Sequence, residues 1–258
     1  MRLLLAALLL PLAACSSPGG DARPALDIVR DAGRRTAEAG SARIGARVDG
    51  GVVTMTMSGV AALDDVTSAM ATTFTAPTGE TLTTLETRLL GDVMYVRTSD
   101  DPGGKPWVRY EIDALAEVGT TTDEVSQARQ NDPRQVLPIL AAAYGNVRTE
   151  GEEEMRGEPA TRYRAQFDLA KARAAEPDAD ARAAVDRLVE SLGAPTLSAT
   201  VWLDRAGRLR RLEYQHDPSR SGQAPPGSGL ITTTYELHDF GVDVVVVAPP
   251  TAQTTRFP

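Results

Sequence analysis

The stretch SARIGARVDGGVVTMTMS, residues 41–58, alternates between apolar and small or polar side chains. Ile44 and Ala46 set the apolar positions of its first half, and Met55 and Met57 set those of its second half. Alternation with a period of two is typical of a β-strand that buries one face. The Asp-Gly-Gly between the halves is a turn sequence, so we expect two antiparallel strands joined by a turn.

The same pattern recurs on the C-terminal side of this stretch. Further strands are predicted at residues 70–74, 85–89, 93–98, 107–112, 147–155, 160–168, 196–203, 209–216, 231–240 and 242–247. Helical spacing is found at residues 25–39, 122–131, 132–144 and 178–192. Strand blocks with helices between them indicate an α+β domain built on one antiparallel sheet. We place this domain at residues 25–250, followed by a polar tail at 251–258.

The N-terminus predicts where the protein is located. Arg2 and the apolar run of residues 3–10 have the form of a secretory signal peptide, and the run is too short to cross a bilayer. Leu12-Ala13-Ala14-Cys15 has the form of a bacterial lipobox. Residues 1–14 are therefore the expected signal peptide, Cys15 the lipidation site, and residues 15–24 a flexible tether. This predicts anchoring at the outer face of the cell membrane.

Composition narrows the classes of partner. The chain has 258 residues and a formal net charge of −8, which argues against binding to nucleic acid. Cys15 is the only cysteine, so no internal disulfide can form. The remaining alternative for Cys15, a stray thiol, is less consistent with its place after the apolar run.

Motifs for catalysis, metal binding and cofactor binding are missing from the sequence. There is no Gly-x-Ser-x-Gly, no His-Glu-x-x-His, no phosphate-binding loop and no dinucleotide fingerprint. His216 and His238 are interpreted as surface or sheet-edge residues. The glutamates between residues 150 and 154 are interpreted as a solvated hairpin, since their spacing fits no calcium loop. We therefore expect no enzyme activity, no cofactor and no metal.

Apolar side chains of intermediate size share one face of the predicted strands. The candidate ligand-lining residues are Met55, Met57, Met70, Phe74, Leu85 and Leu89. Methionine adapts to irregular surfaces, so a curved sheet lined in this way can hold an acyl chain. The alternative, favoured by these residues alone, is that the helices fill the concavity and make this an ordinary core.

A basic cluster follows the predicted turn at residues 204–207. Arg208, Arg210 and Arg211 could contact a phosphate or carboxylate of a partner or a lipid head group. Such clusters are more often a solvated strand end. The Gly/Pro/Ser-rich loop at residues 219–229 could form part of the same contact.

Several of these segments together carry a resemblance to a family. They are the lipobox, Gly91-Asp-Val-Met-Tyr-Val96, Lys105-Pro-Trp-Val108, the hairpin at residues 201–211 and Tyr235-Glu-Leu-His-Asp-Phe-Gly241. In order and spacing they resemble the LppX/LprA/LprF/LprG lipoproteins of actinobacteria, and more distantly the LolA/LolB-type carriers. The resemblance covers residues 26–250.

The resemblance implies a half-barrel fold and a function. It implies a strongly curved antiparallel sheet of about ten strands, with helices over its concave face and a cavity for a lipid, a lipoglycan or an acyl chain. It brings no catalytic residues. The resulting hypothesis is a membrane-anchored, non-enzymatic lipoprotein that binds or carries an apolar ligand in the cell envelope. The alternative is a structural lipoprotein that binds an envelope protein and has no cavity.

Overall fold

The computed structural model describes residues 23–98, 105–112, 136–177, 179–222, 224 and 229–257. The predicted signal peptide at residues 1–14, the lipidation site Cys15 and the predicted helix at residues 122–131 lie outside the described residues. In the described part of the chain, no helix is long and apolar enough to cross a membrane.

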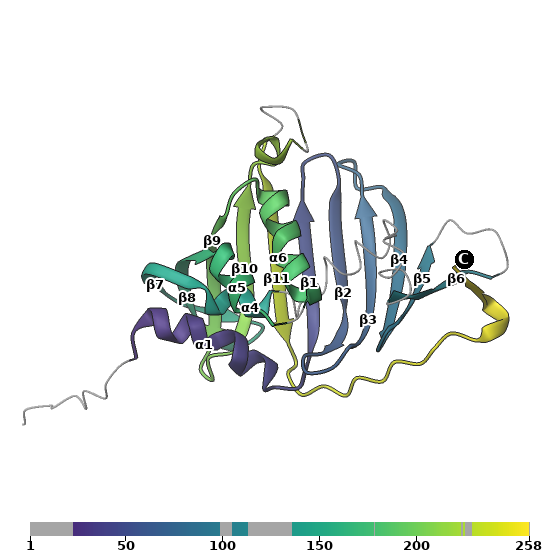
Figure 1. The fold of residues 1–258 in the computed structure, drawn as a ribbon, viewed down its shortest axis with the longest axis horizontal. Coiled ribbons are helices and arrows are strands. Elements are labelled where there is room, and N and C mark those ends of the chain that lie inside the picture. Colours follow the sequence, from purple (N-terminus) through teal and green to yellow (C-terminus); the bar gives the residue numbers. More distant parts are fainter. Residues whose placement is uncertain are drawn as a thin grey trace, which may run out of the picture.

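One curved sheet organises the molecule (Figure 1). Its strands are β1 (Ser41–Asp49), β2 (Thr54–Ala62), β3 (Thr67–Thr75), β4 (Thr81–Leu90), β5 (Val93–Thr98), β6 (Trp107–Glu111), β7 (Ala143–Met155), β8 (Glu158–Asp168), β9 (Thr196–Asp204), β10 (Leu209–His216), β11 (Ile231–His238) and β12 (Thr254–Arg256). Their order across the sheet is β12-β6-β5-β4-β3-β2-β1-β11-β10-β9-β8-β7. All neighbours are antiparallel except β12 and β6, which are parallel. The predicted fold class is confirmed, with twelve described strands instead of about ten.

Strand β1 lies at the centre of this sheet and joins its two halves. It pairs with β2 as the opening sequence pattern predicted, with Ala46 opposite Met57. On its other side it pairs with β11, with Ala46 opposite Tyr235. The central strand therefore brings residues from the two ends of the domain into one continuous face.

The helices cover the concave face on one side of β1 (Figure 1). They are α1 (Ala25–Ala37), α4 (Leu137–Ala141), α5 (Leu169–Ala175) and α6 (Ala179–Leu192). Their apolar residues form one core with the concave faces of β1, β2 and β8–β10, including Leu140, Val185, Ile44 and Val201. A smaller core of Met94, Val96, Tyr110 and Ile112 lies at the other end of the sheet.

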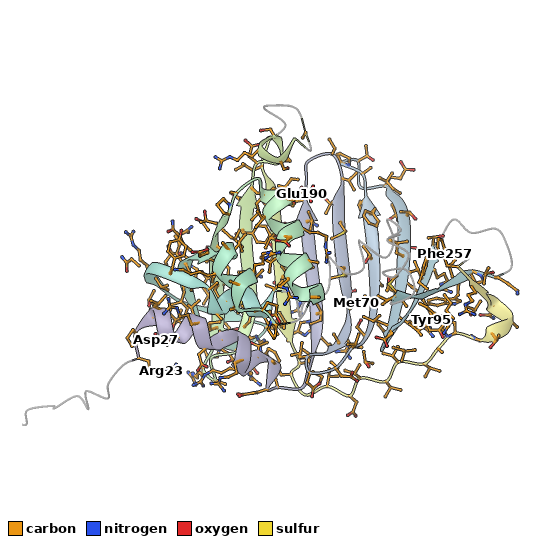
Figure 2. The ribbon with its side chains drawn as sticks, viewed as in Figure 1. Arg23, Asp27, Met70, Tyr95, Glu190 and Phe257 are labelled. Atoms are coloured by element: carbon orange, nitrogen blue, oxygen red, sulfur yellow. The ribbon has the colours of Figure 1, made fainter. Side chains whose placement is uncertain are left out.

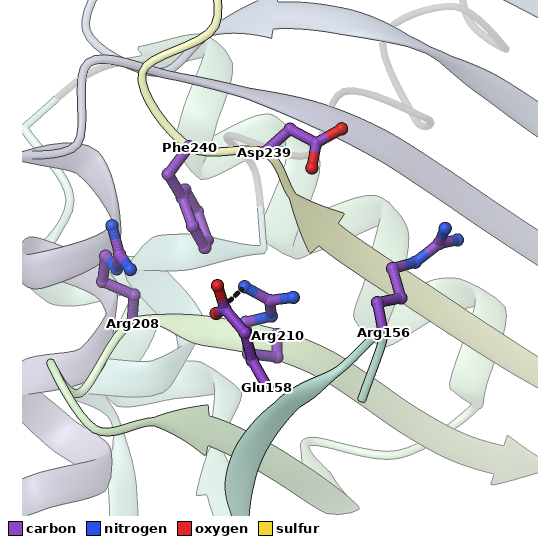
Figure 3. Close-up of a pocket in the computed structure, with 6 residues that line it drawn as sticks. All are labelled: Arg156, Glu158, Arg208, Arg210, Asp239 and Phe240. Atoms are coloured by element: carbon purple, nitrogen blue, oxygen red, sulfur yellow. Dashed lines mark hydrogen bonds and ion pairs between the residues drawn. The ribbon is translucent and has the colours of Figure 1, made fainter. Parts of the chain in front are cut away.

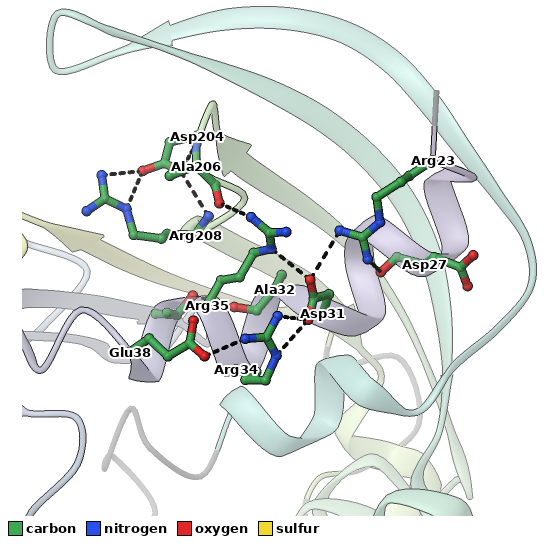
Figure 4. A network of polar contacts seen from close by, with 11 residues as sticks. Arg23, Asp27, Asp31, Ala32, Arg34, Arg35, Glu38, Asp204, Ala206 and Arg208 are labelled. Atoms are coloured by element: carbon green, nitrogen blue, oxygen red, sulfur yellow. Dashed lines mark hydrogen bonds and ion pairs between the residues drawn. The ribbon is translucent and has the colours of Figure 1, made fainter. Parts of the chain in front are cut away.

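Polar contacts attach α1 to the turn between β9 and β10 (Figure 4). Arg35 donates to the backbone carbonyl of Ala206 at 2.9 Å and to the carboxylate of Asp31 at 2.7 Å. Asp31 also accepts from Arg34 and Arg23, and these guanidinium groups hold its pKa well below the usual range. The helix that follows the predicted tether is thus attached to the sheet.

Three predictions for the middle and C-terminal segments are corrected by the structure. The helix expected to reach Tyr144 ends at Ala141, and β7 begins at Ala143. The short helix α5, which begins after an Asp168 side-chain cap, was not predicted. The hairpin turn between β7 and β8 contains only Arg156 and Gly157, because β8 begins at Glu158.

The C-terminal segment also differs from the prediction. Residues 242–247, expected to be a strand, are not part of the sheet, and Val245 and Val247 are exposed. The chain runs past β4, where Arg88 donates to the carbonyl of Val247 at 2.8 Å. The segment expected as a polar tail contributes β12 and places Phe257 against Tyr110, with ring centroids 5.0 Å apart.

Candidate functional site

Strand register places all six candidate ligand-lining residues on the concave face. Met55 is opposite Phe74, and Met70 is opposite Gly59. Leu85 is opposite Thr72, which is itself opposite Met57 on the other neighbouring strand. Leu89 is opposite Ser68 on one side and Met94 on the other. The structure therefore brings these side chains together across β2, β3 and β4.

One of the six candidate residues is much more buried than the other five. Met57 is only 3% exposed and belongs to the core under the helices. Met55, Met70, Phe74, Leu85 and Leu89 are half-buried. Met70 packs at the border of the larger core, and Leu85 and Leu89 pack at the border of the smaller one. We call these five residues the apolar strip, since they lie between the two cores.

Close strand packing limits how the strip can be arranged. Figure 2 labels Met70 on the sheet. Its sulfur lies 2.6 Å from the position that a Cβ atom on Gly59 would occupy, and the carbonyl oxygen of Ala69 lies 2.1 Å from that position. Only glycine therefore fits at position 59, because its neighbours on β3 leave no room for a side chain.

A row of neutral polar side chains continues the concave face beyond β1. Tyr214 on β10 is opposite Thr233 on β11, and Tyr235 lies two residues further along β11. Burial raises the pKa of both tyrosines, so both phenols are neutral at physiological pH. This row was not among the candidate residues, because isolated tyrosines on strands do not distinguish a site from a core.

His216, predicted to be a surface or edge residue, lies on this same face. Its two ring nitrogens are buried and have no hydrogen-bond partner among the residues that the structure describes. Burial lowers its pKa, an effect that the nearby Asp217 carboxylate partly offsets. The prediction for His216 is therefore wrong. Its alternation with exposed Gln215 could have indicated an inward-facing side chain, but not the lack of partners.

The arginine cluster lies on the convex side and is paired within the protein. Arg208 and Asp204 are 2.8 Å apart, and Arg210 and Glu158 are 3.0 Å apart. Arg211 donates to Glu236 at 2.9 Å. Since each charge has a carboxylate partner, the cluster has the character of a strand end stabilised by ion pairs.

A shallow pocket of about 210 Å³ adjoins this cluster (Figure 3). It is lined by Arg156, Glu158, Arg208, Arg210, Asp239 and Phe240. The Arg208 guanidinium lies 4.4 Å from the centre of the Phe240 ring. The pocket is polar and separated from the apolar strip by the sheet.

The glutamate-rich hairpin forms ion pairs with neighbouring strands. Glu150 accepts from Arg164 at 2.7 Å, which lowers its pKa, and Glu153 accepts from Trp202 at 2.9 Å. Among the described residues, no three His, Cys, Asp or Glu side chains are grouped so that they could hold a metal ion.

Comparison with solved structures assigns the architecture. The lipoprotein LppX of Mycobacterium tuberculosis aligns with a TM-score of 0.51 and 15% identity, covering 86% of this chain and 98% of that protein. This chain has the LppX-type fold. LprF of Mycobacterium bovis aligns with the same TM-score at 13% identity, covering 87% of this chain and 96% of LprF. At these identities the likeness concerns the fold, and at that level the predicted resemblance is confirmed.

Sequence comparison finds relatives in Streptomyces. An uncharacterized protein from the rplA–rplJ intergenic region of Streptomyces griseus is 29% identical over 87% of this chain and 76% of its own length. A candidate lipoprotein of Streptomyces coelicolor is 27% identical over 94% of this chain and 80% of its own length. No protein-family model matches the chain.

Proposed function

We propose that this protein is an exported, membrane-anchored lipoprotein that binds or carries an apolar molecule, such as a lipid or lipoglycan, in the cell envelope, without enzymatic activity. The anchor is the lipid on Cys15. The Streptomyces coelicolor relative is described as a candidate lipoprotein, and LppX is named a lipoprotein, which supports this part of the proposal.

The apolar strip is the observation that carries ligand binding. Five apolar side chains stay half-buried on the face that elsewhere forms the core of the domain. Each fully buried side chain of this kind contributes about 1.5–3 kcal/mol relative to an exposed one. An acyl chain along the strip would recover part of that energy without a change in the sheet.

The ion pairs of the convex side argue against the alternative function, which is binding of an envelope protein through the arginine cluster. A protein-binding lipoprotein that used Arg208, Arg210 and Arg211 would need to break the pairs with Asp204, Glu158 and Glu236. The structure offers no free cation among these three. The apolar strip therefore gives better support to the lipid-binding function.

Two neighbouring residues on β3 provide a matched test. Phe74 lies on the concave face and Thr73 on the convex face, and both are half-buried. Phe74→Glu places a carboxylate where the ligand would lie, whereas Thr73→Glu places the same charge on the other face. The full chain is purified in detergent, and binding of a fluorescent fatty-acid analogue is measured together with co-purifying lipid.

We expect Phe74→Glu to weaken binding of the probe by tenfold or more and to deplete co-purifying lipid, because a buried unpaired charge is costly. Thr73→Glu should bind like the unmodified protein. Equal binding by both variants, or no binding by the unmodified protein, would contradict the proposed function.

A further inference from the structure

Charge is distributed unequally between the two faces of the sheet. Arg43, Arg97, Arg211 and Glu236 lie on the convex face. Every position that alternation places on the concave face of β11, β1–β4 and residues 212–216 of β10 is apolar, glycine, serine, threonine or tyrosine, except His216; Arg210 lies at the bulge of β10 and is paired with Glu158. Arg187 on the neighbouring helix α6 already interacts within the chain. A charged head group would find no free counter-ion on this part of the sheet.

His216 has unused hydrogen-bonding capacity on this uncharged face. A neutral imidazole has one N–H donor and one acceptor nitrogen. Both nitrogens of His216 are buried and have no hydrogen-bond partner in the described part of the chain, although buried polar groups are nearly always paired in native proteins. A hydroxyl group both donates and accepts, so it could bond to either nitrogen of the neutral ring.

Neighbouring phenols extend the polar site. The rings of Tyr214 and His216 are 6.2 Å apart. Tyr214 interacts with the hydroxyl of Thr233, and it lies close enough to Tyr235 to add to the effect of burial in raising the pKa of that phenol. These groups are neutral donors and acceptors, so the site suits an uncharged polar group.

The register connects this polar site to the apolar strip. Tyr214, Thr233, Val48, Met55 and Phe74 are successive partners across β10, β11, β1, β2 and β3. Neighbouring strands are about 4.8 Å apart, so this row spans about 19 Å. A molecule with a polar head at β10 and an extended acyl chain would reach the strip.

We propose that His216, with the hydroxyl of Tyr214, binds the uncharged, hydroxyl-bearing head group of a neutral lipid whose acyl chain lies along the apolar strip. This proposal rests on the lipid-binding function proposed above. It adds the class of head group and the residue that recognises it.

Three lipids with the same acyl chains test the head-group preference. They are dioleoylglycerol, its acetylated analogue without the free hydroxyl, and dioleoyl phosphatidic acid. Affinities are measured for the full chain in detergent by native mass spectrometry. We expect dioleoylglycerol to bind about tenfold more tightly than the acetylated analogue, and phosphatidic acid to bind most weakly.

Substitution of the two histidines assigns the preference to a residue. His216→Phe keeps a planar ring without polar atoms and should bind dioleoylglycerol and its acetylated analogue equally. Its melting temperature should stay the same or rise, because no hydrogen bond within the protein is lost. The control, His238→Phe, removes a convex-face histidine next to Asp239 and should keep the tenfold preference.

Each other result overturns the proposal in a distinguishable way. If none of the lipids binds, both the lipid-binding function and the head-group site are wrong. If the lipids bind without preference, or phosphatidic acid binds most tightly, only the head-group site is wrong. A preference that persists in His216→Phe removes His216 from the site, and a large fall in melting temperature would show that its role is structural.

Discussion

The hydroxyl of Thr36 on α1 accepts a 2.8 Å hydrogen bond from the backbone N–H of Leu209 at the start of β10. The same hydroxyl donates to the carbonyl of Ala32 at 2.6 Å, and Thr36 is completely buried. This contact joins the helix that follows the predicted tether to a central strand of the second half of the sheet.

Removing that hydroxyl should destabilise the domain. Thr36→Val keeps the shape of the side chain but leaves the N–H of Leu209 buried without a partner. We expect the free energy of unfolding to fall by about 1–3 kcal/mol, measured by urea denaturation. Thr36→Ser keeps the hydroxyl and loses only the methyl group, so it should lose less; a loss in Thr36→Val no greater than that in Thr36→Ser would contradict the importance of the hydroxyl.

Replacing Gly33 on the same helix by alanine should destabilise the domain, although alanine has the higher helix propensity. Replacing a glycine inside a helix by alanine ordinarily stabilises it by about 0.5–1 kcal/mol. At Gly33, however, a Cβ atom would lie 2.3 Å from the carbonyl oxygen of Leu137 on α4. We therefore expect Gly33→Ala to lower the free energy of unfolding by about 1–3 kcal/mol. A gain in stability would mean that α1 and α4 are not packed this closely.

The lipid anchor predicts a change in location. In cells fed radiolabelled palmitate, the unmodified protein should carry label and sediment with membranes. Cys15→Ser removes the sulfur that would be acylated, so label should be lost and less of the protein should be recovered with membranes. Retained label in Cys15→Ser would contradict the lipobox prediction.

The half-buried imidazole of His216 predicts a dependence of stability on pH. Burial lowers the pKa of His216 in the folded protein below its unfolded value of about 6.5. Above that pH both states are neutral at this site. Below it the unfolded state binds the proton more readily, so the free energy of unfolding decreases as the pH falls.

Comparison of the unmodified protein with one variant isolates this effect. His216→Phe should lose less stability than the unmodified protein between pH 7 and pH 5. Urea denaturation of both proteins at several pH values measures the difference. An identical pH dependence in His216→Phe would show that this histidine titrates normally.

Strand pairing near the turns was the most predictable part of the fold. The alternation in residues 41–58 predicted β1 and β2, and the turn at residues 204–207 predicted β9 and β10. These elements follow from local periodicity and turn chemistry. Residues 242–247 show the limit of that approach, since their valines favour a strand but these residues are not part of the sheet.

The candidate site was predicted in part. Alternation was sufficient to place Met55, Phe74 and Leu85 on one face, because residues paired across neighbouring strands point to the same face of the sheet. It could also have placed His216 on that face, but not its lack of hydrogen-bond partners among the described residues, which depends on packing that no local pattern encodes. The pairing of β11 with β1 brings Tyr235 beside Ala46, a contact between distant segments that periodicity cannot reveal.

The most direct test of the lipid-binding function is the composition of the protein as isolated. The Cys15→Ser chain, which lacks the anchor lipid, is purified from the cell envelope and extracted with organic solvent, and the extract is analysed by mass spectrometry. We predict a long-chain, uncharged lipid in near-equimolar amount that is depleted in Phe74→Glu and retained in Thr73→Glu. An extract without lipid, or with the same lipid in all three proteins, would contradict the proposed function.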